Sequence, residues 1–516
     1  MSTLVDRGSA RAGLRGAARG GLVNLAGAAF SGLAGLAVTM LVARGLGPDS
    51  AGVFFAATSV FLLAQMLAKL GTDTGLVYWV ARLRATGRAD LVRRCLRVAL
   101  VPVVVAGIAG GVALFVATPG LAHLPALAGR AAGRHTADFA RALRVLAVFL
   151  PAAALSDALL SATRGYRTMR PTVLVEKLAR PALQLVLLAG ALLFAGTTAD
   201  TVAWVAPYLA SFAVAAWWLA RMDRPPTPAG HPVPRLPAGE FWRFTAPRSL
   251  SSICQVALQR LDVLLVAGML GFRAAALYTV ATRFMVVGQL GNQAIGTAVQ
   301  PRLAELLSRH DTAGARTLYR DATAWLVLLT WPLYLGTAAF APLYLGLFGG
   351  GYDAAAGVAA VPLLCAAMLA AAACGMVDMV LTMGGRTTWN LANVAVALGV
   401  NLALNLALIP PLGIVGAALA WAVALLVKNL LPLVQIGLVL RLHPFGPATG
   451  IAAALAVGCV GVPAAAARLV FGPTLLGLVA AVAVAAPAYA AACWLLRSRL
   501  DLLTRKREKT CEPTIP

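Results

Sequence analysis

Charged side chains lie inside long apolar stretches of this chain, where they are rare and point to function. Residues 247–302 hold two such stretches, with Arg260 and Asp262 in the first and Arg283 in the second. In hydrocarbon an ionised group costs roughly 2.5–3.5 kcal/mol on insertion scales, so it normally faces a partner or a wet cavity. Asp262 cannot partner Arg260, because residues two apart on a helix point in different directions. We therefore expect this pair of stretches to line a cavity.

Lysine and arginine residues recur within other apolar stretches of the chain. A cation at such a depth can bind an anionic ligand, such as a phosphate group. Arginine binds phosphate bidentately, and lysine binds it as a point charge. The predicted binding residues are Lys69, Arg260, Arg283 and Lys428, then Arg44 and Arg248 nearer the ends of their stretches, and Gln259 and Asn292 as polar neighbours. The alternative for each cation is an internal ion pair or a side chain that reaches back to the interface.

Four carboxylates at depth could bind a proton or Na⁺, as a group coupled to an ion gradient does, and these are Asp73, Asp157, Asp262 and Asp378. The alternative is that each compensates a neighbouring cation. Glu176 and Arg180 are four residues apart on a predicted helix, so we expect them to pair. The seven Cys and five His residues form no ligand motif, and we expect neither a metal site nor a bound cofactor.

The elements that position these groups are membrane-spanning helices. The chain has 516 residues, of which 60% are hydrophobic and 12% charged, and its mean hydropathy is +0.82. No soluble domain has so little polar surface, and a stretch of about 20 apolar residues crosses a bilayer. An all-α, multi-pass membrane protein follows. Fourteen spans are predicted at 22–43, 51–72, 96–118, 141–163, 172–195, 201–220, 247–269, 274–299, 321–347, 354–382, 389–410, 414–439, 449–470 and 474–496.

The domain organisation is predicted from the breaks between spans. A basic cytoplasmic segment at 1–21 precedes an N-terminal lobe of six spans at 22–220, and a Pro-rich cytoplasmic linker occupies 221–246. A C-terminal lobe of six spans follows at 247–440, then a helix pair at 441–497 and a basic cytoplasmic tail at 498–516.

The net charge of +24 reflects membrane topology rather than nucleic-acid binding. With the N-terminus inside, most Lys and Arg residues fall in loops and tails assigned to the cytoplasm, which is the positive-inside bias. We therefore place the chain in the cytoplasmic membrane of the cell with both termini in the cytoplasm. Its basic surface suits anionic membrane lipids, and we expect no nucleic-acid partner.

An internal repeat links the two predicted lobes. Residues 43–58, ARGLGPDSAGVFFAAT, align without a gap on residues 267–282, AGMLGFRAAALYTVAT, so that Gly47 falls on Gly271. Gly165-Tyr166-Arg167 and Gly384-Gly385-Arg386 correspond in the same order. Repeats of this kind are typical of transporters with a substrate path between two related halves.

At ARGLGPDSAGVF, at LGTDTGLV (70–77) and at ATRGYRTMRPTVLVEKLARP (162–181), the chain resembles the polysaccharide-flippase branch of the multidrug/oligosaccharidyl-lipid/polysaccharide (MOP) exporter superfamily. This branch includes Wzx-type oligosaccharide flippases. The resemblance covers the whole chain and implies a MATE-like fold of twelve core helices plus two. It also implies transport of an undecaprenyl-diphosphate-linked oligosaccharide by alternating access, with cations lining a central cavity and no enzymatic step.

Two transport alternatives share this fold, and these are a lipid II flippase and a MATE-type antiporter of cationic drugs. The antiporter should have an acidic cavity, whereas cations here match or outnumber acids at depth. A glycan polymerase or ligase needs a sizeable outward loop, and 119–140 is too poor in acid/base groups for that role. Expected partners are the lipid-linked anionic glycan, membrane lipids, and the polymerase and glycosyltransferases of the same pathway. The energy source is open between an H⁺ gradient, a Na⁺ gradient and the membrane potential.

Overall fold

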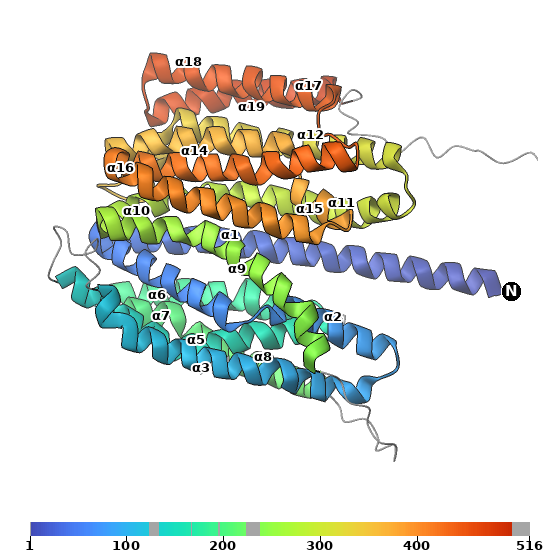
Figure 1. Cartoon of the computed structure of the whole chain (residues 1–516). Coiled ribbons are helices and arrows are strands. Elements are labelled where there is room, and N and C mark those ends of the chain that lie inside the picture. The colour runs from blue at the N-terminus through green and yellow to red at the C-terminus, as the bar shows by residue number, and fades with distance from the viewer. Residues whose placement is uncertain (1, 123–133, 167, 195–196, 223–237, 498–516) are drawn as a thin grey trace, which may run out of the picture. The chain divides into compact units, whose positions relative to one another are not determined.

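The structure is a computed structural model that describes residues 2–122, 134–166, 168–194, 197–222 and 238–497, with side chains from Val23 onward (Figure 1). These residues are almost entirely helical and contain no β-strand. Helices are expected here, because in hydrocarbon every backbone N–H and C=O must be satisfied within its own segment. The predicted all-α class is confirmed.

The predicted membrane spans are present as helical rods. Ten helical stretches in the described residues are long and apolar enough to cross a membrane. Two of them, Val23–Ala85 and Thr387–Val439, are each divided into two rods by a non-helical glycine, Gly47 or Gly413. The segments 172–194 and 272–308 supply the remaining two of the fourteen predicted rods. The chain is therefore a multi-pass membrane protein of the predicted class.

The helices in the first part of the chain have the following bounds: α1 Ser2–Ala68, α2 Thr72–Ala85, η1 Ala89–Leu91, α3 Val92–Ala122, α5 Arg134–Gly165, η2 Thr172–Ala179, α6 Arg180–Phe194, α7 Thr197–Val205, α8 Pro207–Met222, α9 Ala238–Leu270 and α10 Phe272–Ala281. The short segment η2 is a π-helix, whereas η1 is a 3-10 helix. Helix α9 begins inside the predicted linker 221–246, most of which lies outside the described residues.

The helices in the second part have these bounds: α11 Met285–Ser308, α12 Thr312–Ala339, α13 Ala341–Gly346, α14 Ala355–Cys374, α15 Val377–Met383, α16 Thr387–Val439, α17 Pro447–Ala456, η3 Val457–Gly461, α18 Val462–Phe471 and α19 Leu475–Leu495. The tail 498–516 lies outside the described residues.

The aligned glycines of the internal repeat share one backbone conformation. Gly47 has φ 72° and ψ 170°, and Gly271 has φ 94° and ψ 173°. Each interrupts the chain directly before a new helix, which starts at Pro48 in one repeat and at Phe272 in the other. A positive φ of this kind is accessible mainly to glycine. The repeat seen in the sequence is therefore also a repeat in the structure.

The chain divides into two compact units. The first comprises Met1–Leu290, Leu345–Ala360 and Asn390–Ala424, and the second comprises Gly291–Tyr344, Val361–Trp389 and Leu425–Pro516. In the first unit, α2, α3, α5 and α9 enclose a core that includes Leu76, Leu160 and Phe241. In the second, α17 packs on α12, and α18 packs on α19, which forms the predicted C-terminal helix pair (Figure 1). The division into two six-helix lobes stays a prediction.

One face of α3 shows how these helices meet lipid. Val101, Val105, Ile108, Val112 and Phe115 are all exposed and lie three or four residues apart. This spacing places them on one face of the helix. An apolar face that the described residues leave exposed is suited to acyl chains rather than to water.

Candidate substrate-binding site

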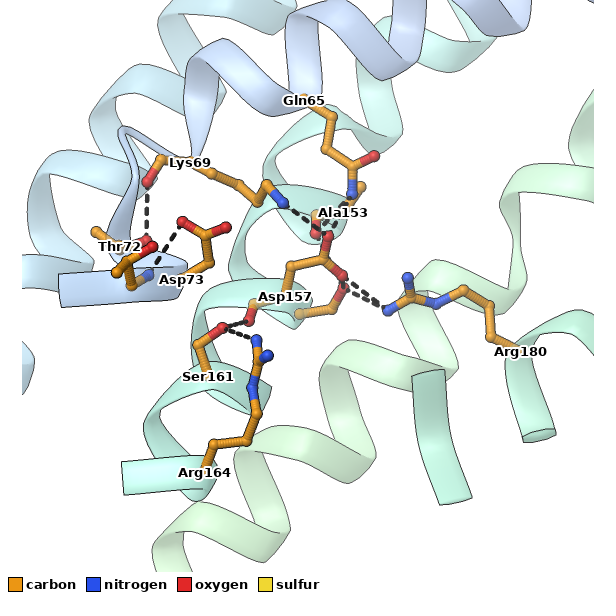
Figure 2. A network of polar contacts seen from close by, with 11 residues as sticks. Gln65, Lys69, Thr72, Asp73, Ala153, Asp157, Ser161, Arg164 and Arg180 are labelled. Atoms are coloured by element: carbon orange, nitrogen blue, oxygen red, sulfur yellow. Dashed lines mark hydrogen bonds and ion pairs between the residues drawn. The ribbon is translucent and has the colours of Figure 1, made fainter. Parts of the chain in front are cut away.

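The centre of the candidate site is Asp157 on α5, whose carboxylate contacts two cations in the first unit (Figure 2). Nζ of Lys69, just beyond the end of α1, lies 3.5 Å from Oδ2. Nη2 of Arg180, at the start of α6, lies 3.1 Å from Oδ1. The three side chains are 13%, 8% and 19% exposed for Lys69, Arg180 and Asp157. One carboxylate thus faces two largely buried cations, and Glu176 on η2 is near enough to interact electrostatically with all three side chains.

Neutral groups fix this cluster in place. Nε2 of Gln65 donates to Oδ2 of Asp157 and to the carbonyl of Ala153, at 3.2 Å in each case. The guanidinium of Arg180 donates to the hydroxyls of Ser156 (3.1 Å) and Ser211 (3.2 Å). It also lies 4.4 Å from the centre of the Tyr208 ring, a cation–π distance. The cations are therefore held in defined positions before any ligand arrives.

A third cation extends the cluster along α5. Nη2 of Arg164 donates to Oγ of Ser161 at 2.6 Å, and that hydroxyl donates to the backbone carbonyl of Asp157 at 2.8 Å. Figure 2 shows Arg164, Ser161 and Asp157 in one column, with Asp73 beside Lys69. Nε of Arg164 is buried and has no hydrogen-bond partner among the residues that the structure describes. A buried N–H without a partner is uncommon and calls for an explanation, and an anionic ligand that reaches it would be one.

Arg180 pairs with Asp157 rather than with Glu176, so the predicted pairing of Glu176 with Arg180 was wrong. The reason is the π-helix η2, which contains Glu176 and ends directly before Arg180. In a π-helix the backbone hydrogen bonds join residues five apart, so residues four apart do not share a face as they do in an α-helix. Short π-helical segments are frequent at functional sites.

Arg164 and Arg180 were missed as site residues by sequence reasoning. Both belong to ATRGYRTMRPTVLVEKLARP (162–181), the longest motif that carries the family resemblance. That motif was the signal that could have found them.

The predicted binding and coupling residues form two separate Lys–Asp pairs. In the first unit Lys69 pairs with Asp157, and in the second Nζ of Lys428 lies 3.3 Å from Oδ2 of Asp378. In both pairs the carboxylate compensates the charge of the lysine, which is the alternative that the sequence left open for these four residues. A compensated cation can still exchange its carboxylate for a phosphate.

Arg260 and Asp262 are neighbours on α9 with different surroundings. Arg260 is partly buried and makes neither an ion pair nor a hydrogen bond with the part of the chain that the structure describes. Asp262 is 2% exposed and accepts hydrogen bonds from the Tyr278 hydroxyl and from Nδ2 of Asn405, both at 3.0 Å. As expected, these two charged residues do not pair.

The other predicted residues are spread over the surface and the helix ends. Arg44 donates to the carbonyl of Leu347 at 2.9 Å, and Nε of Arg283 donates to that of Thr279 at 3.3 Å. Arg248 lies over the Phe244 ring, 3.9 Å from its centre. Asp73 accepts from the backbone N–H of Thr74 at 3.1 Å. Gln259 and Asn292 are exposed.

No group of three or more His, Cys, Asp or Glu side chains in the described residues could hold a metal ion.

Solved structures with the same fold are transporters. The chain matches a lipid II flippase, MurJ, in an inward closed conformation, with a TM-score of 0.73 and 13% identity over 93% of this chain and 99% of that one. It also matches a multidrug resistance MATE family transporter of the MOP superfamily in an inward-facing conformation, with a TM-score of 0.64 and 16% identity over 82% and 99%.

A third match is a MOP superfamily transporter from Pyrococcus furiosus, with a TM-score of 0.55 and 16% identity over 82% of this chain and 96% of that one. At these identities the matches show the fold, which is MATE-like. No curated protein sequence matches the chain closely enough to count as a relative.

The sequence itself matches one family model. The match spans residues 41–355, more than half of the chain, and it contains Lys69, Asp157, Arg164 and Arg180. The model describes a polysaccharide biosynthesis protein. The chain therefore belongs to the polysaccharide biosynthesis protein family, and it has the fold of the MOP transporters.

Proposed function

We propose that this protein moves an undecaprenyl-diphosphate-linked oligosaccharide, the precursor of a cell-surface polysaccharide, across the cytoplasmic membrane by alternating access. The observation that carries the proposal is the buried cluster of Lys69, Asp157 and Arg180, in which two cations share one carboxylate. A diphosphate can replace that carboxylate, because phosphate oxygens accept the same charge-assisted hydrogen bonds. The exchange compensates both cations while the headgroup crosses hydrocarbon.

Membership of the polysaccharide biosynthesis family supports a glycan as cargo. The fold shared with a lipid II flippase supports a diphosphate-linked lipid. Lipid II itself is the alternative substrate.

For the Pyrococcus furiosus transporter, reverse polarity of the binding pocket is said to suggest a different function. By the same reasoning, a cationic cluster here favours an anionic cargo over the cationic drugs of a MATE-type antiporter.

The proposal also covers the energy source, the topology and the partners of the protein. The protein acts as a transporter rather than as an enzyme, and it uses no cofactor. An H⁺ or Na⁺ gradient or the membrane potential supplies the energy, with Asp73, Asp157, Asp262 and Asp378 as the candidate coupling groups. Both termini lie in the cytoplasm, and the polymerase and glycosyltransferases of the pathway act beside the protein.

The test is transport by the purified protein in liposomes. A fluorescent undecaprenyl-diphosphate oligosaccharide is incorporated, and its exposure on the opposite leaflet is followed for the wild type, for Lys69→Gln and Arg180→Gln in the cluster, and for Arg260→Ala and Arg283→Ala. A hydrogen bond to a charged group contributes about 1.5–3 kcal/mol, so each substitution should slow flipping roughly 10- to 100-fold. Arg144→Ala is the matched control, because Arg144 is exposed and lies near the Phe115 ring, away from the cluster residues.

Four results would contradict the proposal or its residues. Flipping that survives both Lys69→Gln and Arg180→Gln removes the Asp157 cluster from the mechanism. Flipping that survives both Arg260→Ala and Arg283→Ala removes those two residues from it. A wild type that flips lipid II but not the oligosaccharide moves the function to the lipid II alternative. A wild type that flips neither lipid, and instead exports a cationic dye, moves it to the drug antiporters.

A further inference from the structure

A pocket of about 700 Å³ opens beside the Asp157 cluster, within the first unit, and no function has yet been assigned to it. Its walls come from α2, the end of α5 and the beginning of α9, and they include Asp73, Tyr78, Arg82, Arg164 and Phe244. The volume falls within the roughly 300–1,000 Å³ that is usual for small-molecule sites. Asp73 and Arg164 also appear beside the cluster in Figure 2, so the pocket and the cluster adjoin.

One wall of the pocket is an aromatic platform. The rings of Tyr78 and Phe244 are stacked, with centroids 4.1 Å apart and an angle of 18° between their planes. Tyr78 is 40% exposed. A flat, accessible aromatic face receives the C–H face of a sugar ring, because its π-system is negatively polarised.

A guanidinium lies close to each ring of this platform, and a further arginine, Arg164, lines the pocket. The guanidinium of Arg82 is 5.9 Å from the centre of the Tyr78 ring, and that of Arg248 is 3.9 Å from the centre of the Phe244 ring. Arg164 adds its buried, unpartnered Nε–H. The pocket lining contains one acidic side chain, Asp73, and two arginines, Arg82 and Arg164, so the lining has a net positive charge. An anionic ligand with an apolar face fits this combination.

The platform is one of several contacts between α2 and α9. These helices already approach closely at Gly75, where an added Cβ would clash with the side chain of Thr245, and at Gly71, which packs on Ser249. The Tyr78–Phe244 stack lies beyond these contacts, at the exposed side. Arg82 is exposed as well, and it donates to the Tyr78 hydroxyl at 3.3 Å, which orients that ring.

From these observations we infer that the pocket is a docking site for the phosphorylated sugar of the lipid-linked glycan, which the pocket holds before the diphosphate reaches Lys69 and Arg180. The sugar ring stacks on the exposed face of Tyr78, which Phe244 supports from the other side. The sugar hydroxyls donate to Asp73, and the phosphate next to the sugar binds Arg82 and Arg164. This inference rests on the proposed function, because it assigns a subsite to the same cargo.

The test uses glucose 1-phosphate as a soluble probe of the purified full-length protein in detergent. Saturation-transfer NMR reports which sugar protons contact the protein, and a titration gives the dissociation constant. In Arg82→Gln and Tyr78→Leu the dissociation constant should rise roughly tenfold. Arg84→Gln is the matched control, because Arg84 is also an exposed arginine of α2 but lies over Tyr166 and does not line the pocket.

Several outcomes would overturn the inference. Equal binding of inorganic phosphate would indicate a bare anion site, and equal binding of glycerol 1-phosphate would indicate a phospholipid headgroup site. Affinities that are unchanged in Arg82→Gln, which is an exposed position and should not impair folding, would exclude this pocket as the binding site.

Flipping assays on the same variants separate this inference from the proposed function. If the wild type flips the glycan while all variants bind the probe equally, the docking site is wrong and the function stands. If the probe binds as expected but the wild type flips no glycan, the proposed function is wrong and the sugar-phosphate site remains.

Discussion

Asp49 and Arg273 occupy equivalent positions in the two internal repeats, and they form an ion pair with each other, with Oδ2 of Asp49 3.4 Å from Nη1 of Arg273. A residue can contact its own counterpart only where the two repeats meet. This contact lies two residues after Gly47 and Gly271, the glycines that share one conformation. The meeting point is therefore built from equivalent parts of both repeats.

Because both side chains of this pair are about half exposed, we expect it to contribute little to stability. Arg273→Gln should change the free energy of unfolding by less than about 1 kcal/mol. The double exchange Asp49→Arg with Arg273→Asp should restore the wild-type value. Thermal unfolding in detergent measures this, with Arg309→Gln, which breaks the exposed pair with Glu305, as a control. A loss above about 3 kcal/mol would show that the pair is far better shielded than its exposure indicates.

The Asp157 cluster should behave in the opposite way. Asp157→Asn leaves Lys69 and Arg180 without their carboxylate in a largely buried site. Removing one partner of a buried ion pair typically costs about 3–5 kcal/mol. The double variant Lys69→Gln with Asp157→Asn should recover part of this loss in the same unfolding measurement. Arg141→Gln, which breaks the more exposed pair with Asp138, should cost about 0–1 kcal/mol. Equal losses in Asp157→Asn and Arg141→Gln would contradict a buried cluster.

Asp262 is the candidate coupling group whose described hydrogen bonds all come from neutral donors, Tyr278 and Asn405. A carboxylate in such a site can take up a proton or compensate the charge of Na⁺, whereas the neutral amide of asparagine does neither. We expect Asp262→Asn to fold normally and to flip lipid, but to lose the acceleration by an imposed H⁺ or Na⁺ gradient. The measurement is flipping with and without each gradient, with Asp311→Asn on an exposed helix cap as the control. Undiminished acceleration in Asp262→Asn would remove Asp262 as a coupling group.

Gly52 is required by the close approach of α1 and α10. A Cβ on Gly52 would clash with the backbone carbonyl of Phe272, which cannot move aside as a side chain can. Gly52→Ala should therefore destabilise the protein by about 1–3 kcal/mol. Gly35→Ala, on the same helix with open space around it, should stabilise by up to about 1 kcal/mol. The two melting temperatures should move in opposite directions, and a stable Gly52→Ala variant would contradict the close packing.

The predicted topology is tested with fusion reporters. Green fluorescent protein fluoresces only when it folds in the cytoplasm, whereas alkaline phosphatase is active only outside it. The positive-inside bias predicts fluorescence and no phosphatase activity for fusions after Pro516, and the reverse for fusions in the loop 119–140. Phosphatase activity at the C-terminus would invert the orientation.

The sequence by itself determined the class of the protein and the positions of its helices. Apolar length is a local property, and a span of hydrocarbon width can form only a helix in lipid. The repeat was also visible in the sequence, because Gly47 and Gly271 fill positions with positive φ that few other residues can adopt. For the same local reason, the sequence excluded a pair between Arg260 and Asp262.

Only the tertiary structure decided which charges meet. Lys69 and Asp157 are far apart in the sequence, and nothing in their spacing predicts that α1 and α5 bring them within 3.5 Å of each other. The π-helix η2 redirects Arg180 from Glu176 to Asp157, and no simple residue pattern predicts that change of register. The Tyr78–Phe244 platform likewise arises where α2 and α9 cross. Pairing between distant helices depends on packing, and packing is a property of the whole fold rather than of any one stretch.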